Sequence, residues 1–256
     1  MTAFADWLAL REPADAAARS VELVDRLRLD PPLLVHDLGS GTGSMARWLT
    51  PRLPVPQHWV LHDRDADLLA RAAGTLPPGV TAESRVGDLS RLTSADLAGA
   101  SLLTASALLD MLTAAEIERL VAACAGLPTL LTLTVVGAVA FDPPDPRDAA
   151  VAAAFDAHQR RTVGGRTPTG PNAADVALTA FRNHKIAVET RETPWILRSG
   201  PLALAWFEGW TRAALEHDPG LSAQLNGYVD TRVEQLRSGR LEVSVGHRDL
   251  FAPGTG

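Results

Sequence analysis

The chain has 256 residues, of which 46% are hydrophobic and 21% charged, and its formal net charge is −6. This composition is typical of a globular protein with one substantial core, and it excludes a disordered chain. The negative charge supplies no positive field for phosphate backbones or anionic lipids, so we expect neither a nucleic acid nor a membrane as partner.

The first predicted element is a helix over residues 14–29, where apolar residues recur every three or four positions until Pro31-Pro32 ends the segment. The apolar run Leu33–Leu38 then predicts a strand. A glycine-rich loop, 39–43, follows it directly, and helical spacing resumes after the loop. The local order is therefore strand, tight loop, helix.

Strands and helices alternate from there to residue 136, which implies right-handed crossovers and a parallel sheet with helices on both faces. The predicted strands are Trp59–His62, Thr81–Val86, Ser101–Ala107 and Thr129–Val136, and the helices are Ala66–Ala73 and Thr113–Ala125. The turn-rich stretch Phe141–Pro146 interrupts the pattern. Beyond it we predict helices at Ala149–Arg161, Asn172–Asn183, around Trp206 and at Leu221–Leu236, and strands at Ile186–Thr190 and Leu241–Val245.

These elements predict a single α/β domain over residues 1–256, with a doubly wound, mostly parallel, seven-stranded sheet and an antiparallel last strand. An extra N-terminal helix and helical insertions after the fifth and sixth strands complete it. The expected parts are an N-terminal helical lid (1–32), a cofactor-binding core (33–140), an insertion that also serves as a lid (141–170), and the remaining core (171–256) with a helical insertion at about 199–239.

Glycines at 39, 41 and 43 let the backbone turn sharply off the first strand and approach a ligand closely. The helix behind the loop favours an anionic group, either a carboxylate or a phosphate. Ser44 stands where dinucleotide-binding loops have their third glycine, and no Walker-type phosphate loop occurs in the sequence. The pattern therefore disfavours a nucleotide phosphate.

Two acidic residues follow the next two predicted strands. Asp63 comes 24 residues after Gly39, where a carboxylate can accept hydrogen bonds from both ribose hydroxyls of an adenosine. Asp88 follows the third strand, where its carboxylate can accept a hydrogen bond from an exocyclic amine. The three signals in this order predict an adenosine ligand.

These residues resemble the successive motifs of class I S-adenosylmethionine-dependent methyltransferases. The resemblance rests on Val35–Gly43, His62–Asp65 and Gly87–Leu89, and it covers residue 33 to about residue 136. Thr104–Asp110 resembles the fourth motif, which closes over the methyl donor. The family's acceptor-selecting segments vary between members, so the acceptor does not follow from the resemblance.

The resemblance implies that the glycine loop faces the methionine part of the donor, that Asp63 binds the ribose, and that Asp88 with Leu89 contacts the adenine. Asp37 either binds the donor ammonium or orients the loop, and Arg19 either pairs with the donor carboxylate or is solvated. The expected S-adenosylmethionine-binding residues are Arg19, Asp37, Gly39, Ser40, Gly41, Gly43, Asp63, Arg64, Gly87, Asp88, Leu89 and Ser106.

The candidates for catalysis and acceptor binding are chosen from their positions relative to the predicted strands and helices. His158, in the segment expected to overhang the donor, is the first candidate for an acid or base, with a solvated helix face as its alternative. Asp110 either orients an acceptor proton or caps the helix that follows it. Arg11 and Arg161 favour an acidic acceptor, and Trp195 either lines the acceptor pocket or packs in the core.

The single cysteine, Cys124, has no second cysteine for a disulfide, and no His, Cys, Asp and Glu grouping has metal-ligand spacing. No run of about 18 apolar residues occurs, and residues 1–11 lack the basic start of a signal peptide. We therefore expect a cytoplasmic protein without a metal. A monomer and a homodimer both remain open.

The sequence thus predicts an S-adenosylmethionine-dependent methyltransferase that acts on a small-molecule acceptor, by O- or N-methylation. Three alternatives remain: a donor-binding protein without transferase activity, a methyltransferase acting on protein or RNA, and a nicotinamide-dependent oxidoreductase of the same architecture. Ser44 and Asp88 weigh against the last of these.

Overall fold

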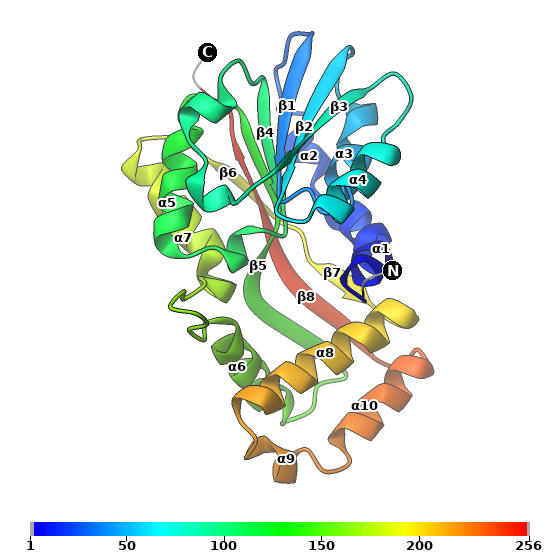
Figure 1. Ribbon diagram of the computed structural model, residues 1–256. Coiled ribbons are helices and arrows are strands. Elements are labelled where there is room, and N and C mark those ends of the chain that lie inside the picture. Colours follow the sequence, from blue (N-terminus) through cyan, green and yellow to red (C-terminus); the bar gives the residue numbers. More distant parts are fainter. Residues whose placement is uncertain (1–2, 255–256) are drawn as a thin grey trace.

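A computed structural model of the chain describes residues 3–254, which fold around one eight-stranded mixed sheet (Figure 1). The strand order is β3-β2-β1-β4-β5-β8-β6, with β7 paired to β8. The first five strands are parallel, and β8 runs antiparallel to β5, β6 and β7. The strands are β1 Leu33–Leu38, β2 Gln57–Asp63, β3 Thr81–Val86, β4 Leu102–Ser106, β5 Thr129–Asp142, β6 Glu189–Glu192, β7 Trp195–Leu197 and β8 Glu242–Ala252.

Helices cover both faces of the sheet, as predicted, with α5 and α7 on one side and α3 and α4 on the other (Figure 1). The α-helices are α1 Ala3–Ala18, α2 Val21–Val24, α3 Ser44–Leu49, α4 Ala66–Gly74, α5 Ala114–Ala123, α6 Asp148–Gln159, α7 Ala173–Asn183, α8 Pro201–His217, α9 Leu221–Gln224 and α10 Tyr228–Arg237. None of the helices within residues 3–254 combines the length and the apolar character needed to cross a bilayer.

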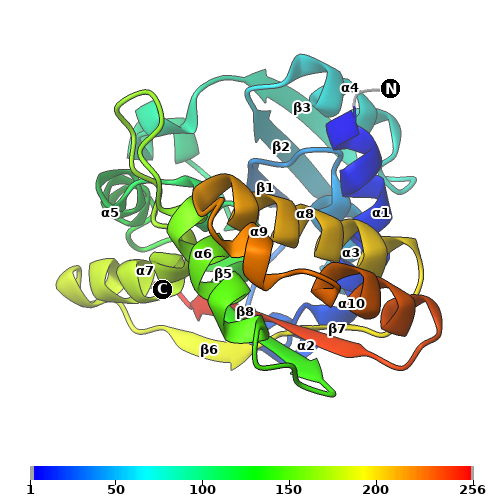
Figure 2. The same ribbon diagram turned by 90° about the horizontal axis from the view of Figure 1, so that it is seen from below.

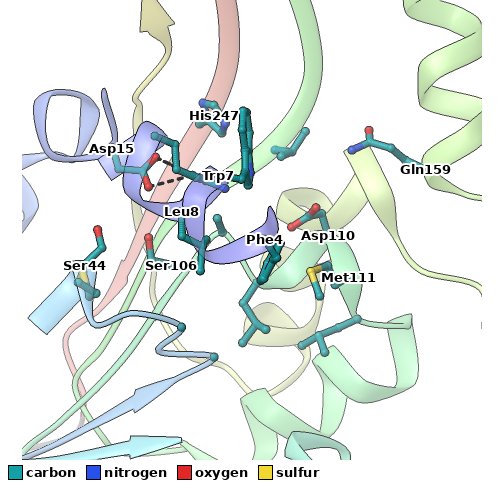
Figure 3. A pocket seen from close by; sticks show the side chains of 18 of the residues that line it. Phe4, Trp7, Leu8, Asp15, Ser44, Ser106, Asp110, Met111, Gln159 and His247 are labelled. Atoms are coloured by element: carbon teal, nitrogen blue, oxygen red, sulfur yellow. Dashed lines mark hydrogen bonds and ion pairs between the residues drawn. The ribbon is translucent and has the colours of Figure 1, made fainter. Parts of the chain in front are cut away.

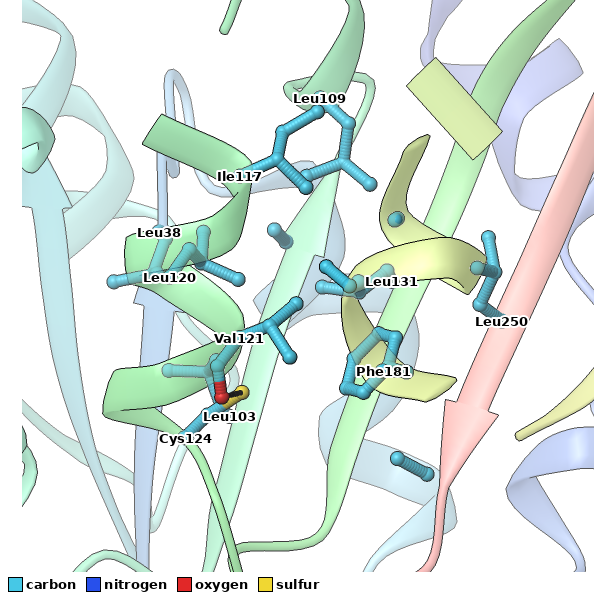
Figure 4. Close-up of a cluster of buried hydrophobic side chains, with 14 of the residues drawn as sticks. Leu38, Leu103, Leu109, Ile117, Leu120, Val121, Cys124, Leu131, Phe181 and Leu250 are labelled. Carbon is cyan, nitrogen blue, oxygen red and sulfur yellow. Dashed lines mark hydrogen bonds between the residues drawn. The ribbon is translucent and has the colours of Figure 1, made fainter. Parts of the chain in front are cut away.

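The core forms where helices bury apolar stripes against the sheet. On one face, Ile117 of α5 and Phe181 of α7 pack against Leu103 and Leu131 of the sheet (Figure 4). On the opposite face, α2, α3 and α4 surround Trp59 of β2. Each of these side chains, fully buried, contributes about 1.5–3 kcal/mol, so the two clusters hold the strand ends in fixed positions.

The N-terminal helix differs from the prediction of 14–29. It spans Ala3–Ala18 and includes Pro13, and a second short helix begins at Val21. Ser20 separates them because its Oγ accepts a hydrogen bond from Leu23 N (3.2 Å), which caps α2. Pro13 lies at an exposed position inside α1 and does not end that helix. The break between α1 and α2 comes instead at Ser20, whose hydroxyl caps α2.

The fifth strand is longer than predicted, because β5 continues past residue 136 to Asp142 and pairs with β8 along its whole length. Two register shifts interrupt the pairing, and Leu133 (φ 55°) and Gly137 (φ 68°) adopt left-handed backbone conformations there. These bulges bend β5 and β8 together. The extra strand β7 pairs with the part of β8 that lies beside this extension, and it accounts for the eighth strand.

A buried carboxylate, Asp249 on β8, joins three segments that are distant in sequence. Its oxygens accept hydrogen bonds from Leu133 N in the β5 bulge (2.7 Å), Thr193 Oγ1 before β7 (2.8 Å) and Ser20 N at the start of α2 (2.9 Å). Its side chain is completely buried. Asp249 therefore connects the N-terminal helices to the bent part of the sheet.

Three titratable side chains, Cys124, His36 and His62, are buried and do not line the cavity described below. Burial raises the pKa of the Cys124 thiol to about 11, which keeps it protonated. His36 of β1 and His62 of β2 face each other within the sheet, with His36 Nδ1 and His62 Nε2 3.0 Å apart. Desolvation lowers the pKa of both imidazoles to about 4, so the pair is neutral at pH 7.

Candidate active site

The carboxyl ends of the parallel strands open into a cavity of about 760 Å³ that continues between α1, α6 and α8 (Figure 3). Its glycine-loop end is lined by Arg19, Asp37, Gly39, Ser40, Gly41, Asp63, Arg64, Gly87, Asp88, Leu89 and Ser106. Its aromatic end is lined by Trp7, Phe155, Trp195, Trp206 and Trp210. The cavity therefore lies where open α/β sheets bind their ligands, outside the carboxyl ends of the strands.

The glycine loop forms one wall because its backbone adopts left-handed conformations. Gly39 has φ 64° and Gly41 φ 52°, and a Cβ at Gly39 would lie 2.9 Å from Leu108 Cδ1. Gly41 N donates to Asp63 Oδ2 (2.9 Å), which ties the loop to the end of β2. Gly43 (φ 84°) precedes α3 and shapes the turn without lining the cavity.

Arg19 and Asp37 lie at the floor of the glycine-loop end, and both are almost fully buried. Arg19 Nη2 donates to Ser44 Oγ (3.1 Å) and Ser106 Oγ (3.0 Å), and Thr104 Oγ1 donates to Asp37 Oδ1 (2.7 Å). Arg19 Nε and Nη1 and Asp37 Oδ2 have no partner within residues 3–254. These buried donors and this acceptor are available to a ligand that carries both an anionic group, for Arg19, and a cationic group, for Asp37.

Their ionisation follows from burial. Desolvation raises the pKa of Asp37 to about 7, although the Thr104 hydroxyl and the Arg19 guanidinium favour the carboxylate. Burial also lowers the pKa of Arg19, while the carboxylates of Asp15 and Asp37 oppose that shift. Arg19 stays charged, and Asp37 titrates near neutrality.

Asp63 and Asp88 occupy the ends of β2 and β3, as their positions in the sequence predict. Asp63 Oδ1 accepts from Asp65 N (3.0 Å), so the backbone fixes both of its oxygens. Asp88 Oδ1 accepts from Ser90 N (2.9 Å), and this hydrogen bond lowers the pKa of Asp88. Both groups face the cavity as carboxylates whose orientation is already set.

Asp110 lines the cavity where the two ends meet, next to Phe4 and Met111 (Figure 3). It does not cap α5, because Thr113 does: Thr113 Oγ1 accepts from Glu116 N (3.2 Å). Desolvation raises the pKa of Asp110 to about 6. A carboxyl with that pKa can accept a proton near neutral pH.

His158 and Arg161 are the two predicted side chains outside the cavity. Arg161 Nη1 donates to His158 Nδ1 (2.7 Å), so the opposite nitrogen, Nε2, donates to Glu216 Oε2 (3.2 Å). The structure thus gives His158 no access to the cavity, and Asp156 and Gln159 of the same helix line it instead.

Arg11 and Trp195 lie together at the aromatic end. The Arg11 guanidinium stands 4.8 Å from the centroid of Trp195, and Arg11 Nε donates to Asp15 Oδ2 (3.0 Å). Asp15 is nearly buried beside it. The charge of Arg11 is therefore compensated within the protein, which leaves it poorly suited to bind an acidic acceptor.

Several lining residues were not among the predicted site residues. Trp7 belongs to α1, whose residues 4, 7, 8 and 11 recur at helical spacing and all line the cavity. Trp206 and Trp210 of α8 pack in the core and also line the cavity. His247 of β8 lines the cavity as well. The helical spacing of the apolar residues in α1 and α8 was the signal in the sequence that could have identified these lining residues.

No family model matches the sequence, and no curated protein is significantly similar to it. Solved structures are similar in fold. Mycolic acid cyclopropane synthase CmaA1, complexed with SAH and CTAB, aligns with a TM-score of 0.50 at 11% identity over 93% of this chain and 82% of that one. The cyclopropane synthase MmaA2 from Mycobacterium tuberculosis gives 0.50 at 12% identity over 90% and 81%.

An O-methyltransferase family protein from Burkholderia thailandensis also aligns with a TM-score of 0.50, at 16% identity, over 95% of this chain and 58% of that one. At such identities the likeness concerns the fold.

Proposed function

From this fold, which is that of class I S-adenosylmethionine-dependent methyltransferases, we propose that the chain transfers a methyl group from S-adenosylmethionine to a small-molecule acceptor. The observation that carries the proposal is the buried, unsatisfied pair Arg19 and Asp37 at the floor of the glycine-loop end. An amino-acid group has the carboxylate and the ammonium that this pair requires.

The other residues of the glycine-loop end fit the rest of the donor. Asp63 would accept hydrogen bonds from the two ribose hydroxyls, and Asp88 with Leu89 would contact the adenine edge. Gly39 and Gly41 leave room for the ligand to approach the backbone. The cavity volume of about 760 Å³ lies within the range of sites that hold small molecules, which supports a small acceptor.

When bound, the donor supplies a methyl group made electrophilic by the neighbouring sulfonium. The chain's part is to hold the acceptor in line with that methyl group and to exclude water. The glycine-loop end fixes the donor, while α1, α6 and α8 cover the aromatic end (Figure 2). Asp110, between the two ends, is placed to accept a proton from the acceptor.

Replacing Arg19 by alanine tests the proposed orientation of the donor. We expect S-adenosylhomocysteine to bind about 30-fold more weakly, because a buried charge-assisted hydrogen bond to its carboxylate is lost. The analogue 5′-methylthioadenosine has no amino-acid part, so its affinity should change less than about threefold. Calorimetric titration of both ligands measures the difference. Equal losses for the two ligands would show that Arg19 does not bind the carboxylate.

The pH dependence of donor binding tests Asp37. In the free protein its pKa is about 7, and an ammonium beside it would lower that pKa, so binding releases a proton below neutrality. The affinity for S-adenosylhomocysteine should therefore be full above that pKa and fall about tenfold between about pH 8 and pH 6. Asp37→Asn should bind weakly with a flat profile. A wild-type profile that is equally flat would refute this role.

A further inference from the structure

The aromatic end of the cavity is walled by ring faces from four elements. Trp7 comes from α1, Phe155 from α6, Trp195 from β7, and Trp206 and Trp210 from α8. The last two rings are nearly parallel, with centroids 5.5 Å apart. Such walls favour a flat or hydrocarbon body in the acceptor, and their faces attract cations.

Two carboxyl groups interrupt these apolar walls, and neither is paired with a cation. Asp110 Oδ1 is buried without a partner within residues 3–254. Asp156 Oδ2 lies against the β5 bulge, 2.9 Å from the position that a Cβ on Gly137 would occupy. Across the described part of the chain, no side chain forms a salt bridge with either group. Burial raises the pKa of both carboxyls.

The positive groups nearby do not balance these carboxyls. Arg11 is neutralised by Asp15, and Arg19 belongs to the glycine-loop end. Desolvation lowers the pKa of His247 to about 4, so that imidazole is neutral. Arg160 and Arg212 are solvent-exposed, and although Arg212 also lines the cavity, water and salt screen both charges. The buried charge at the aromatic end is therefore negative.

We propose that the acceptor is an amine with an apolar, aromatic-sized body, and that the methyl group is transferred to its nitrogen. This inference rests on the proposed function and names the substrate class of the same cavity. The ring faces hold the body, and Asp110 and Asp156 hold the ammonium. An acidic acceptor would place like charges together in a poorly solvated site.

Asp110 acts as the base in the proposed methyl transfer. The amine enters as an ammonium, and Asp110 accepts one of its protons, which frees the nitrogen lone pair. That lone pair forms the new bond to the methyl carbon, and the carbon–sulfur bond breaks with its electron pair going to sulfur. The nitrogen leaves as a methylated ammonium, and Asp110 returns its proton to water. The pKa of about 6 at Asp110 suits this exchange.

Three probes with one skeleton test the substrate class: 2-phenylethylamine, 2-phenylethanol and phenylacetate. Each is titrated into the wild-type protein saturated with S-adenosylhomocysteine, so a failure of donor binding is seen first and counts against the proposed function alone. We expect the amine to bind at least about tenfold more tightly than the alcohol or the acid. Absence of amine binding, or equal binding of either other probe, would overturn the inference.

Asp110→Asn and Asp156→Asn keep the shape of the side chain and remove its charge. Each should weaken 2-phenylethylamine at least about tenfold while the affinity for S-adenosylhomocysteine stays within about twofold. Asp230→Asn, at an exposed position on α10 away from the cavity, is the matched control and should change neither value. If the two variants instead weaken S-adenosylmethionine relative to S-adenosylhomocysteine and leave the amine unchanged, the carboxyls serve the sulfonium and the inference is wrong.

Discussion

Replacement of Asp63 by alanine is expected to weaken the binding of S-adenosylhomocysteine about a hundredfold. The carboxylate is held by two backbone amides, Gly41 N and Asp65 N, at the end of β2. Its removal would delete the two hydrogen bonds that we propose it accepts from the ribose hydroxyls, and it also releases the glycine loop from β2. Calorimetric titration at about pH 8, where carboxylates are ionised, measures the loss.

Asp67 provides the matched control for this variant. It lies in the same loop-to-helix segment, on the first turn of α4, but it is exposed and does not line the cavity. Asp67→Ala should bind S-adenosylhomocysteine within about twofold of the wild type. If Asp63→Ala binds as well as Asp67→Ala does, the ribose does not lie at Asp63.

Replacement of Asp249 by alanine is expected to lower the free energy of unfolding by about 3–5 kcal/mol. The change leaves two buried backbone N–H groups, of Ser20 and Leu133, and the hydroxyl of Thr193 without their acceptor. Those three donors come from the N-terminal helices, the β5 bulge and the segment before β7. Urea denaturation followed by circular dichroism gives the free energy.

The control for stability is Asp230→Ala, since that carboxylate is exposed and should change the free energy of unfolding by less than about 0.5 kcal/mol. Asp249→Ala should also weaken S-adenosylhomocysteine binding, because α1 and α2 position Arg19. A cost below about 1 kcal/mol would mean that Asp249 does not hold these segments together.

The glycine-loop end could be predicted from the sequence because its residues are local to strand ends. Gly39 directly follows β1, Asp63 ends β2 and Asp88 comes two residues after β3, and parallel strands bring their carboxyl ends to one edge of the sheet. Knowing which strand each residue follows was therefore enough to predict that the three residues lie close together. Arg19 also reaches this site, although the helix around it was predicted with the wrong limits.

The aromatic end could not be predicted in the same way, because its ring faces come from four separate elements. Helix α6 shows the difficulty. The sequence indicates the helix, but only packing decides its rotation: with 3.6 residues per turn, His158 points about 200° away from Asp156, whereas Gln159 shares the face of Asp156. The helical spacing of Trp206 and Trp210 predicts that they lie on a buried face, but it does not distinguish a core position from a position in a cavity wall.

The long, bent β5 was also beyond sequence reasoning. The aspartates and prolines at 142–146 do end the strand, but the apolar run before them gave no sign that Leu133 and Gly137 would bulge. That bend depends on pairing with β8, more than 100 residues later in the chain. It carries β5 toward α6 and α8 and so creates the wall of the cavity beyond the parallel strands (Figure 1).

The most direct test of the central claim combines binding and transfer in one preparation. The protein is first titrated with S-adenosylhomocysteine and then incubated with S-adenosylmethionine labelled on the methyl group and a panel of small amines, alcohols and acids. We predict one binding site with a dissociation constant below about 100 μM, followed by transfer of label to an acceptor from the panel. The absence of any S-adenosylhomocysteine binding at about 1 mM would contradict the account.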